Sequence, residues 1–143
     1  MSILRLLGKF YGFYPEDPVA AWRVDSVIDA AADLQDAFWD LMNASHNKES
    51  ETKTEKMLEK YLRKTLNIYL RVMQQRLAAN GNPRHLVGDK VTLADFITAH
   101  CAYTYFMNEH NQYYKEQQEV INREDFKDIK AYLVNLKEDV LKE

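Results

Sequence analysis

One stretch, Gly88–Phe96, constrains the fold more than any other because it specifies how a buried helix begins. Thr92 stands at an N-cap position, and Asp95 three residues later can accept a hydrogen bond from the Thr92 amide, so two backbone donors are satisfied reciprocally. Val91 and Phe96 are spaced as a hydrophobic staple, which fixes the angle at which the chain enters the helix. The residues that follow are apolar or small on nearly every side, which is typical of a helix buried all round.

The composition indicates a single helical domain. The chain has 143 residues, enough for one hydrophobic core, and only 4 glycines and 3 prolines interrupt its long periodic segments. We therefore expect an all-α fold. The net charge of -3, from 19 basic and 22 acidic residues, argues against nucleic acid as a main partner.

The N-terminal segment and the single cysteine indicate the cellular compartment of the protein. Cys101 is the single cysteine, which fits a reducing environment. The short apolar run at the N-terminus is interrupted by Lys9, and no small-residue cleavage site of a signal peptide follows it. We expect a cytoplasmic protein without membrane association.

Apolar residues spaced by three and four predict the other helices. Asp17 followed by Pro18 is a favourable helix start, because proline lacks only an N–H that the first turn leaves unpaired anyway. Gly12 and the pair Asn80–Gly81 are favourable helix ends. The expected helices run over residues 3–11, 18–43, 53–79 and 124–141.

Two segments lack this pattern. Residues 45–53 are polar and are expected to form an exposed loop, although Thr52 and Glu55 form a second candidate capping box. Residues 108–118 are polar and rich in tyrosine and have no clear period. We assign no element to this second segment.

The second predicted helix carries a row of carboxylates, which we name the acidic stripe. Its members follow one another at spacings of four, four, three and four, so they share one side of the helix: Asp25, Asp29, Asp33, Asp36 and Asp40. Like charges at this spacing each cost roughly 0.2–0.5 kcal/mol on an exposed helix, unless cations approach them. Arg5 and Lys9, one turn apart on the first helix, are such cations. The stripe is either a solvated acidic face or a surface that binds cations.

These residues resemble a known family. Residues 2–34 resemble, without a gap, the segment that joins the two domains of pi-class cytosolic glutathione transferases. The residues that carry the resemblance are Ser2-Ile3-Leu4-Arg5, Gly8-Lys9, Gly12-Phe13-Tyr14, Val24-Asp25, Asp29 and Asp33-Leu34. The stretch Gly88–Phe96 resembles the N-capping box in the C-terminal domain of the sigma, mu and pi classes. The resemblance implies a glutathione transferase C-terminal-type helical bundle over residues 13–143. Residues 1–12 would then be the last helix of a thioredoxin-like N-terminal domain that is absent from this sequence.

The resemblance also implies roles for single residues at a dimer interface. Arg5 and Lys9 would pair with Asp25 and Asp29 across a homodimer. Asp33 would reach the glutathione that is bound by the neighbouring subunit, towards its γ-glutamyl ammonium.

The same resemblance locates an acceptor-substrate pocket and argues against a metal. Asp36 and Trp39 would line the pocket, and Asn43 stands where mu and pi enzymes have a tyrosine. Sigma-class enzymes that hold a divalent ion in this stripe have another acid at the position of Ala32. We therefore expect no metal site and no cofactor, with glutathione as a co-substrate.

No residue of this chain is predicted to be catalytic. The histidines have no metal-ligand spacing with Cys101, and His100 and Cys101 are expected to be core residues rather than base and nucleophile. In the family, the residue that activates the thiol lies in the thioredoxin-like domain. Two functions therefore remain open: a glutathione transferase whose catalytic half lies outside this sequence, and a non-catalytic interaction domain of the same fold.

Overall fold

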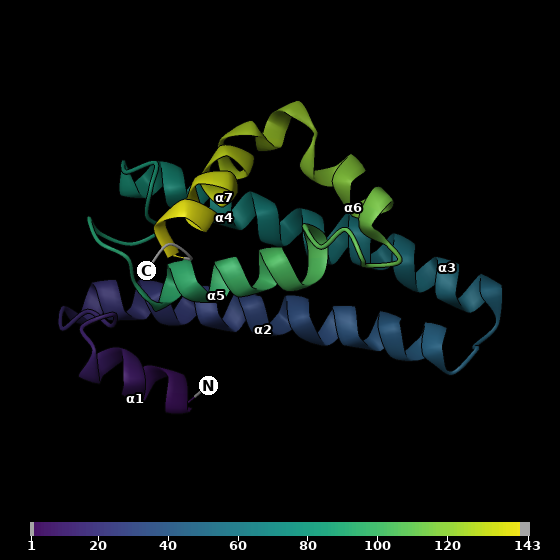
Figure 1. Cartoon of the computed structure of the whole chain (residues 1–143), viewed down its shortest axis with the longest axis horizontal. Coiled ribbons are helices and arrows are strands. Elements are labelled where there is room, and N and C mark those ends of the chain that lie inside the picture. Colours follow the sequence, from purple (N-terminus) through teal and green to yellow (C-terminus); the bar gives the residue numbers. More distant parts are fainter. Residues whose placement is uncertain (1, 141–143) are drawn as a thin grey trace.

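The computed structural model describes residues 2–140, with side chains through residue 137. In chain order its helices are α1 (Ser2–Phe10), α2 (Pro18–His46), α3 (Glu51–Lys60), α4 (Asn67–Asn80), α5 (Leu93–Cys101), α6 (Tyr114–Ile121) and α7 (Lys127–Val140) (Figure 1). Two π-helical turns, η1 (Tyr61–Leu66) and η2 (Ala102–Phe106), and a 3-10 turn, η3 (Glu124–Phe126), adjoin them. The described residues contain no strand, so the predicted all-α fold is confirmed.

The long helix α2 and the central helix α5 form the middle of the bundle, where they run side by side (Figure 1). α2 begins as predicted, because the Asp17 side chain accepts a hydrogen bond from the Ala20 amide at 2.8 Å. It ends at His46 rather than near Asn43. Its apolar residues spaced by three and four are buried: Val24, Ile28, Ala31, Leu34, Phe38 and Leu41.

The predicted third helix is one helical run of α3, η1 and α4. Its end at Gly81 is confirmed, because Gly81 adopts a left-handed conformation with φ 68. The predicted loop before it is shorter than expected, since only residues 47–50 lie between α2 and α3. The second capping box is wrong: α3 begins at Glu51, so Thr52 already lies inside the first turn.

The last helix is also present, with η3 leading into α7. Residues 108–118, to which the sequence assigned no element, contain the start of α6 at Tyr114. This helix has eight residues and buries only Gln117 and Ile121, so it shows no extended apolar stripe. Too few of its side chains enter the core to produce a period in the sequence.

α1 is attached to the start of α5. Gly8 packs so closely on Leu93 that a Cβ atom at Gly8 would lie 2.6 Å from the Leu93 Cδ1 atom. The Leu93 amide donates to the Phe13 carbonyl at 2.9 Å, and the Phe13 ring packs edge-on against Phe96 with ring centroids 5.0 Å apart. These contacts fix α1 on the bundle, while the predicted staple between Val91 and Phe96 stays a prediction.

Candidate functional site

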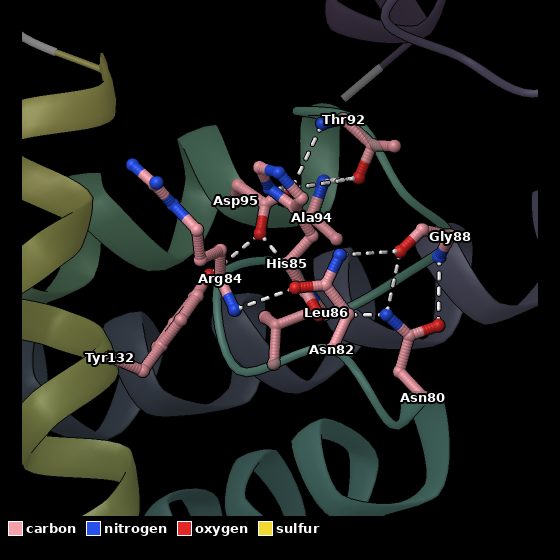
Figure 2. Close-up of polar contacts among 10 residues, drawn as sticks. All are labelled: Asn80, Asn82, Arg84, His85, Leu86, Gly88, Thr92, Ala94, Asp95 and Tyr132. Carbon is pink, nitrogen blue, oxygen red and sulfur yellow. Dashed lines mark hydrogen bonds and ion pairs between the residues drawn. The ribbon is translucent and has the colours of Figure 1, made fainter.

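The predicted capping box is confirmed, and it is the centre of a buried polar network (Figure 2). Asp95 is 0% exposed, and its Oδ2 atom accepts hydrogen bonds from the Thr92 amide at 2.9 Å and the Thr92 hydroxyl at 3.2 Å. Its Oδ1 atom accepts from the Leu86 amide at 3.0 Å and from the Tyr132 hydroxyl at 2.7 Å. Asp95 therefore joins the start of α5 to the preceding loop and to α7.

The loop before α5 is held by a side chain from the end of α4 (Figure 2). The Asn80 amide group donates to the Gly88 carbonyl at 2.7 Å and to the His85 carbonyl at 2.9 Å. Its Oδ1 atom accepts from the Gly88 amide at 2.8 Å. Gly88 has φ 71, a left-handed conformation that favours glycine. The loop thus approaches Asp95 with a defined backbone geometry.

The electrostatics of this network fit a structural role. Burial raises the pKa of Tyr132 well above 10.0, and the charge and hydrogen bond of Asp95 raise it further. Tyr132 therefore remains a neutral donor at physiological pH. The His85 Nδ1 atom lies 4.0 Å from Asp95 Oδ2. Since Asp95 is enclosed by donors and has no exposed surface, it cannot act as a general base towards a substrate.

The basic residues of α1 meet the acidic stripe within one chain. Arg5 Nε donates to Asp25 Oδ1 at 2.6 Å, and Arg5 NH2 lies 3.6 Å from Asp29 Oδ1. The Tyr14 hydroxyl donates to the other Asp25 oxygen at 2.9 Å. The Lys9 ammonium lies 5.3 Å from the Tyr14 ring centroid. The predicted partners of Arg5 are therefore already bound inside the chain, and the interface role of these residues stays a prediction.

Asp33 lies in a groove between α2 and the run η1–α4. It is exposed, and it lines a cavity of about 240 Å³ with Lys64, Ile68 and Val72. Asp36, Trp39 and Asn43 are also exposed on α2, and their spacing of three and four places them on one side of the helix. The structure therefore leaves all four predicted binding residues accessible, with Asp33 in the groove.

Cys101 and His100 were both expected in the core, and only Cys101 is buried. Burial raises the pKa of Cys101 to about 12, so this thiol is a core group and not a nucleophile. His100 is exposed, so its predicted place in the core is wrong. Its ring nitrogens lie 3.3 Å from the Thr104 and Tyr105 hydroxyl oxygens, which lets the polar ring face solvent at this edge of α5.

Sequence reasoning missed two tyrosines of these networks. Tyr132 was not singled out in the sequence, although its hydroxyl reaches Asp95 across 37 positions of the chain. Tyr14 carried no expected contact, yet it binds Asp25. No local pattern signals either contact, because both depend on the packing of separate elements. Among residues 2–137, no group of three histidine, cysteine, aspartate or glutamate side chains could hold a metal ion.

The family model of the glutathione S-transferase C-terminal domain matches residues 33–139, which cover most of the bundle described above. The chain belongs to this family. The match confirms the resemblance to the C-terminal domain of glutathione transferases that was noted in the sequence. Within the described residues, no helix of this glutathione transferase domain is long and apolar enough to cross a membrane.

Two relatives give the extent of the similarity. S-crystallin SL11 of Nototodarus sloanii is 32% identical over 99 residues, which are 68% of this chain and 46% of the relative. The crystal structure of monomeric Na-GST-3, a glutathione S-transferase from the hookworm Necator americanus, matches with a TM-score of 0.74 and 23% identity. This match covers 97% of the chain and 62% of the hookworm protein. The chain thus spans less than two thirds of either relative.

Proposed function

We propose that this chain is the helical part of a cytoplasmic glutathione transferase, in which it supplies dimer contacts and part of the substrate site. The division of the chain follows the same proposal. Residues 1–12 are the last helix of a thioredoxin-like unit, and residues 13–143 form the C-terminal helical domain. The activity would be conjugation of glutathione to an electrophile or an isomerisation of the prostaglandin-synthase type.

The observation that carries this proposal is the exposed apolar surface of α1. Its large apolar side chains face solvent, with Ile3 72% and Phe10 76% exposed, and the set comprises Ile3, Leu6, Leu7, Phe10 and the adjoining Tyr11. Contiguous apolar surface of this kind marks an interaction site. The opposite side of α1 is fixed by Gly8 on Leu93, so the apolar face has a defined orientation for a second unit.

The accessible acids of α2 fit the substrate side of the proposal. Asp33, in its groove, is the residue proposed to meet the glutathione ammonium of a neighbouring subunit. Asp36, Trp39 and Asn43 are proposed to line the acceptor pocket. Lys9 and the Arg5–Asp25–Asp29 cluster are proposed to lie at the dimer interface, where Arg5 keeps its contacts within its own chain.

One observation favours a second function, a non-catalytic interaction domain. The relative with 32% identity is named a crystallin rather than a transferase. A domain of this kind would use the apolar face of α1 for assembly without binding glutathione.

Glutathione binding by a fusion protein separates these functions. A thioredoxin-like domain of a pi- or sigma-class enzyme is joined directly before Ser2, and calorimetry with glutathione is carried out on the free chain and on the fusion. We expect no measurable binding by the free chain, because one exposed carboxylate contributes about 1 kcal/mol or less, while millimolar affinity requires about 4 kcal/mol. The fusion should bind glutathione.

Asp33→Asn in the fusion tests the residue itself, with Asp40→Asn as the matched control on the same helix. Asp33→Asn should weaken glutathione binding without changing the fold, and Asp40→Asn should leave binding unchanged. Glutathione binding by the free chain, or equal effects of the two substitutions, would contradict the proposed role of Asp33.

A further inference from the structure

Helix α2 packs on α4 (Figure 1), and at this contact a hydrogen-bonded serine links an arginine of each helix. The Arg76 NH1 group on α4 donates to the Ser26 hydroxyl oxygen at 2.6 Å, and this hydroxyl donates to the Arg23 carbonyl oxygen at 2.7 Å. Ser26 therefore holds the Arg76 guanidinium against the turn of α2 that carries Arg23. We name Arg23 and Arg76 the arginine pair.

The arginine pair differs from four other arginines of the chain in its partners. Arg5, Arg63, Arg71 and Arg123 each form an ion pair with a carboxylate of the chain. Within the described part of the chain, no such ion pair is found for Arg23 or Arg76. The fold thus brings two positive charges together without an acid between them.

The surroundings of Arg76 make this arrangement unfavourable in the isolated chain. Burial lowers the pKa of Arg76, and the nearby charge of Arg23 lowers it further. The Arg76 Nε atom is buried and has no hydrogen-bond partner. A planar guanidinium matches the oxygens of a carboxylate or a phosphate with two parallel hydrogen bonds. An oxyanion held by the two guanidinium groups would offset the repulsion between them.

We propose that Arg23 and Arg76, positioned by Ser26, form a binding site for an oxyanion of the phosphate or carboxylate class. Arg23 is exposed and Arg76 is half-buried, so the proposed site is open to solvent on the side of Arg23. The oxyanion has two possible sources, free phosphate or an aspartate of a second copy. α2 itself presents Asp33 and Asp40 to solvent, and no ion pair is found for either among the described residues. The site goes beyond the proposed function, since it needs neither glutathione nor a thioredoxin-like unit.

Calorimetry with inorganic phosphate, at an ionic strength kept constant with sodium chloride, tests the first source. We expect saturable binding by the unmodified chain and a loss of affinity of about tenfold or more in Arg23→Gln and in Arg76→Gln. Arg63→Gln is the matched control, because Arg63 is exposed and pairs only with Glu59 one turn away at 3.2 Å. It should bind phosphate like the unmodified chain.

Sedimentation equilibrium without phosphate tests the second source. If an aspartate of a second copy fills the site, the chain self-associates, Arg23→Gln weakens the association, and added phosphate competes with it. Arg23 is exposed, so this variant is expected to fold even where Arg76→Gln does not, and circular dichroism checks both. The proposal is overturned by the absence of both phosphate binding and Arg23-dependent association, or by an equal loss in Arg63→Gln.

Discussion

Asp95 and the acidic stripe of α2 show two opposite uses of the same residue type. Asp95 is fully buried and accepts hydrogen bonds from the chain on both carboxylate oxygens. Asp33, Asp36 and Asp40 are exposed, and no ion pair is found for them among the described residues. The carboxylate of Asp95 finds its hydrogen-bond donors within its own fold. The carboxylates of these members of the acidic stripe can form an ion pair only with a cation from outside the chain.

The physical difference lies in the free-energy cost of removing each carboxylate. Removal of a buried carboxylate leaves several donors without water or another partner, which costs about 1–3 kcal/mol of stability for each donor. An exposed carboxylate beside like charges contributes little and is screened by salt. The first kind of aspartate supports folding, and the second is available for binding.

The largest effect should come from breaking the network around Asp95. Asp95→Ala should lower the free energy of unfolding by about 3–5 kcal/mol, because four hydrogen bonds lose their acceptor. Thr92→Ala should lower it by about 1–2 kcal/mol. Urea unfolding of both variants and of the double mutant should show coupling of about 1 kcal/mol. Strictly additive losses would show that the two residues do not act as one box.

A smaller effect is expected where α1 meets this region. Gly8→Ala places a Cβ atom 2.6 Å from Leu93 Cδ1, and the overpacking should lower stability by about 1–3 kcal/mol, partly offset by a better helix propensity of about 1 kcal/mol. Thermal unfolding measures it. In a Leu93→Ala background the same substitution should no longer destabilise. An unchanged loss in that background would contradict the close packing of α1 on α5.

How much of the structure could be predicted from the sequence depends on how far apart in the chain the contacting residues lie. The start of α5 was predictable, since Thr92 and Asp95 are three residues apart and their spacing alone specifies the box. The contact of Tyr132 with Asp95 was not, because it joins elements 37 residues apart. Likewise, the sequence left open whether the acidic stripe is solvated or binds cations, and only the fold shows that Arg5 meets Asp25 in the same chain. For the candidate site, the sequence identified accessible acids and could not show the groove around Asp33.

The Arg5–Asp25 pair should have a still smaller effect. Its side chains are 32% and 34% exposed, so Arg5→Gln should lower the free energy of unfolding by about 1 kcal/mol or less, and added salt should reduce the difference. Lys53→Gln is the control, since Lys53 forms a more exposed pair with Glu49 at 3.1 Å. Urea unfolding at low and high salt measures both. A large loss that does not respond to salt would place Arg5 with the buried network instead.

The most direct test of the contrast applies one chemical change to both kinds of aspartate. Asp95→Asn and Asp33→Asn each replace a carboxylate by an amide of nearly the same shape, and urea unfolding measures the free energy of each variant. Asp95→Asn should lose about 2–4 kcal/mol, because the amide NH2 group cannot accept the hydrogen bonds made to one carboxylate oxygen. Asp33→Asn should change stability by about 0.5 kcal/mol or less. Comparable losses in the two variants would contradict the division between a folding aspartate and a binding aspartate.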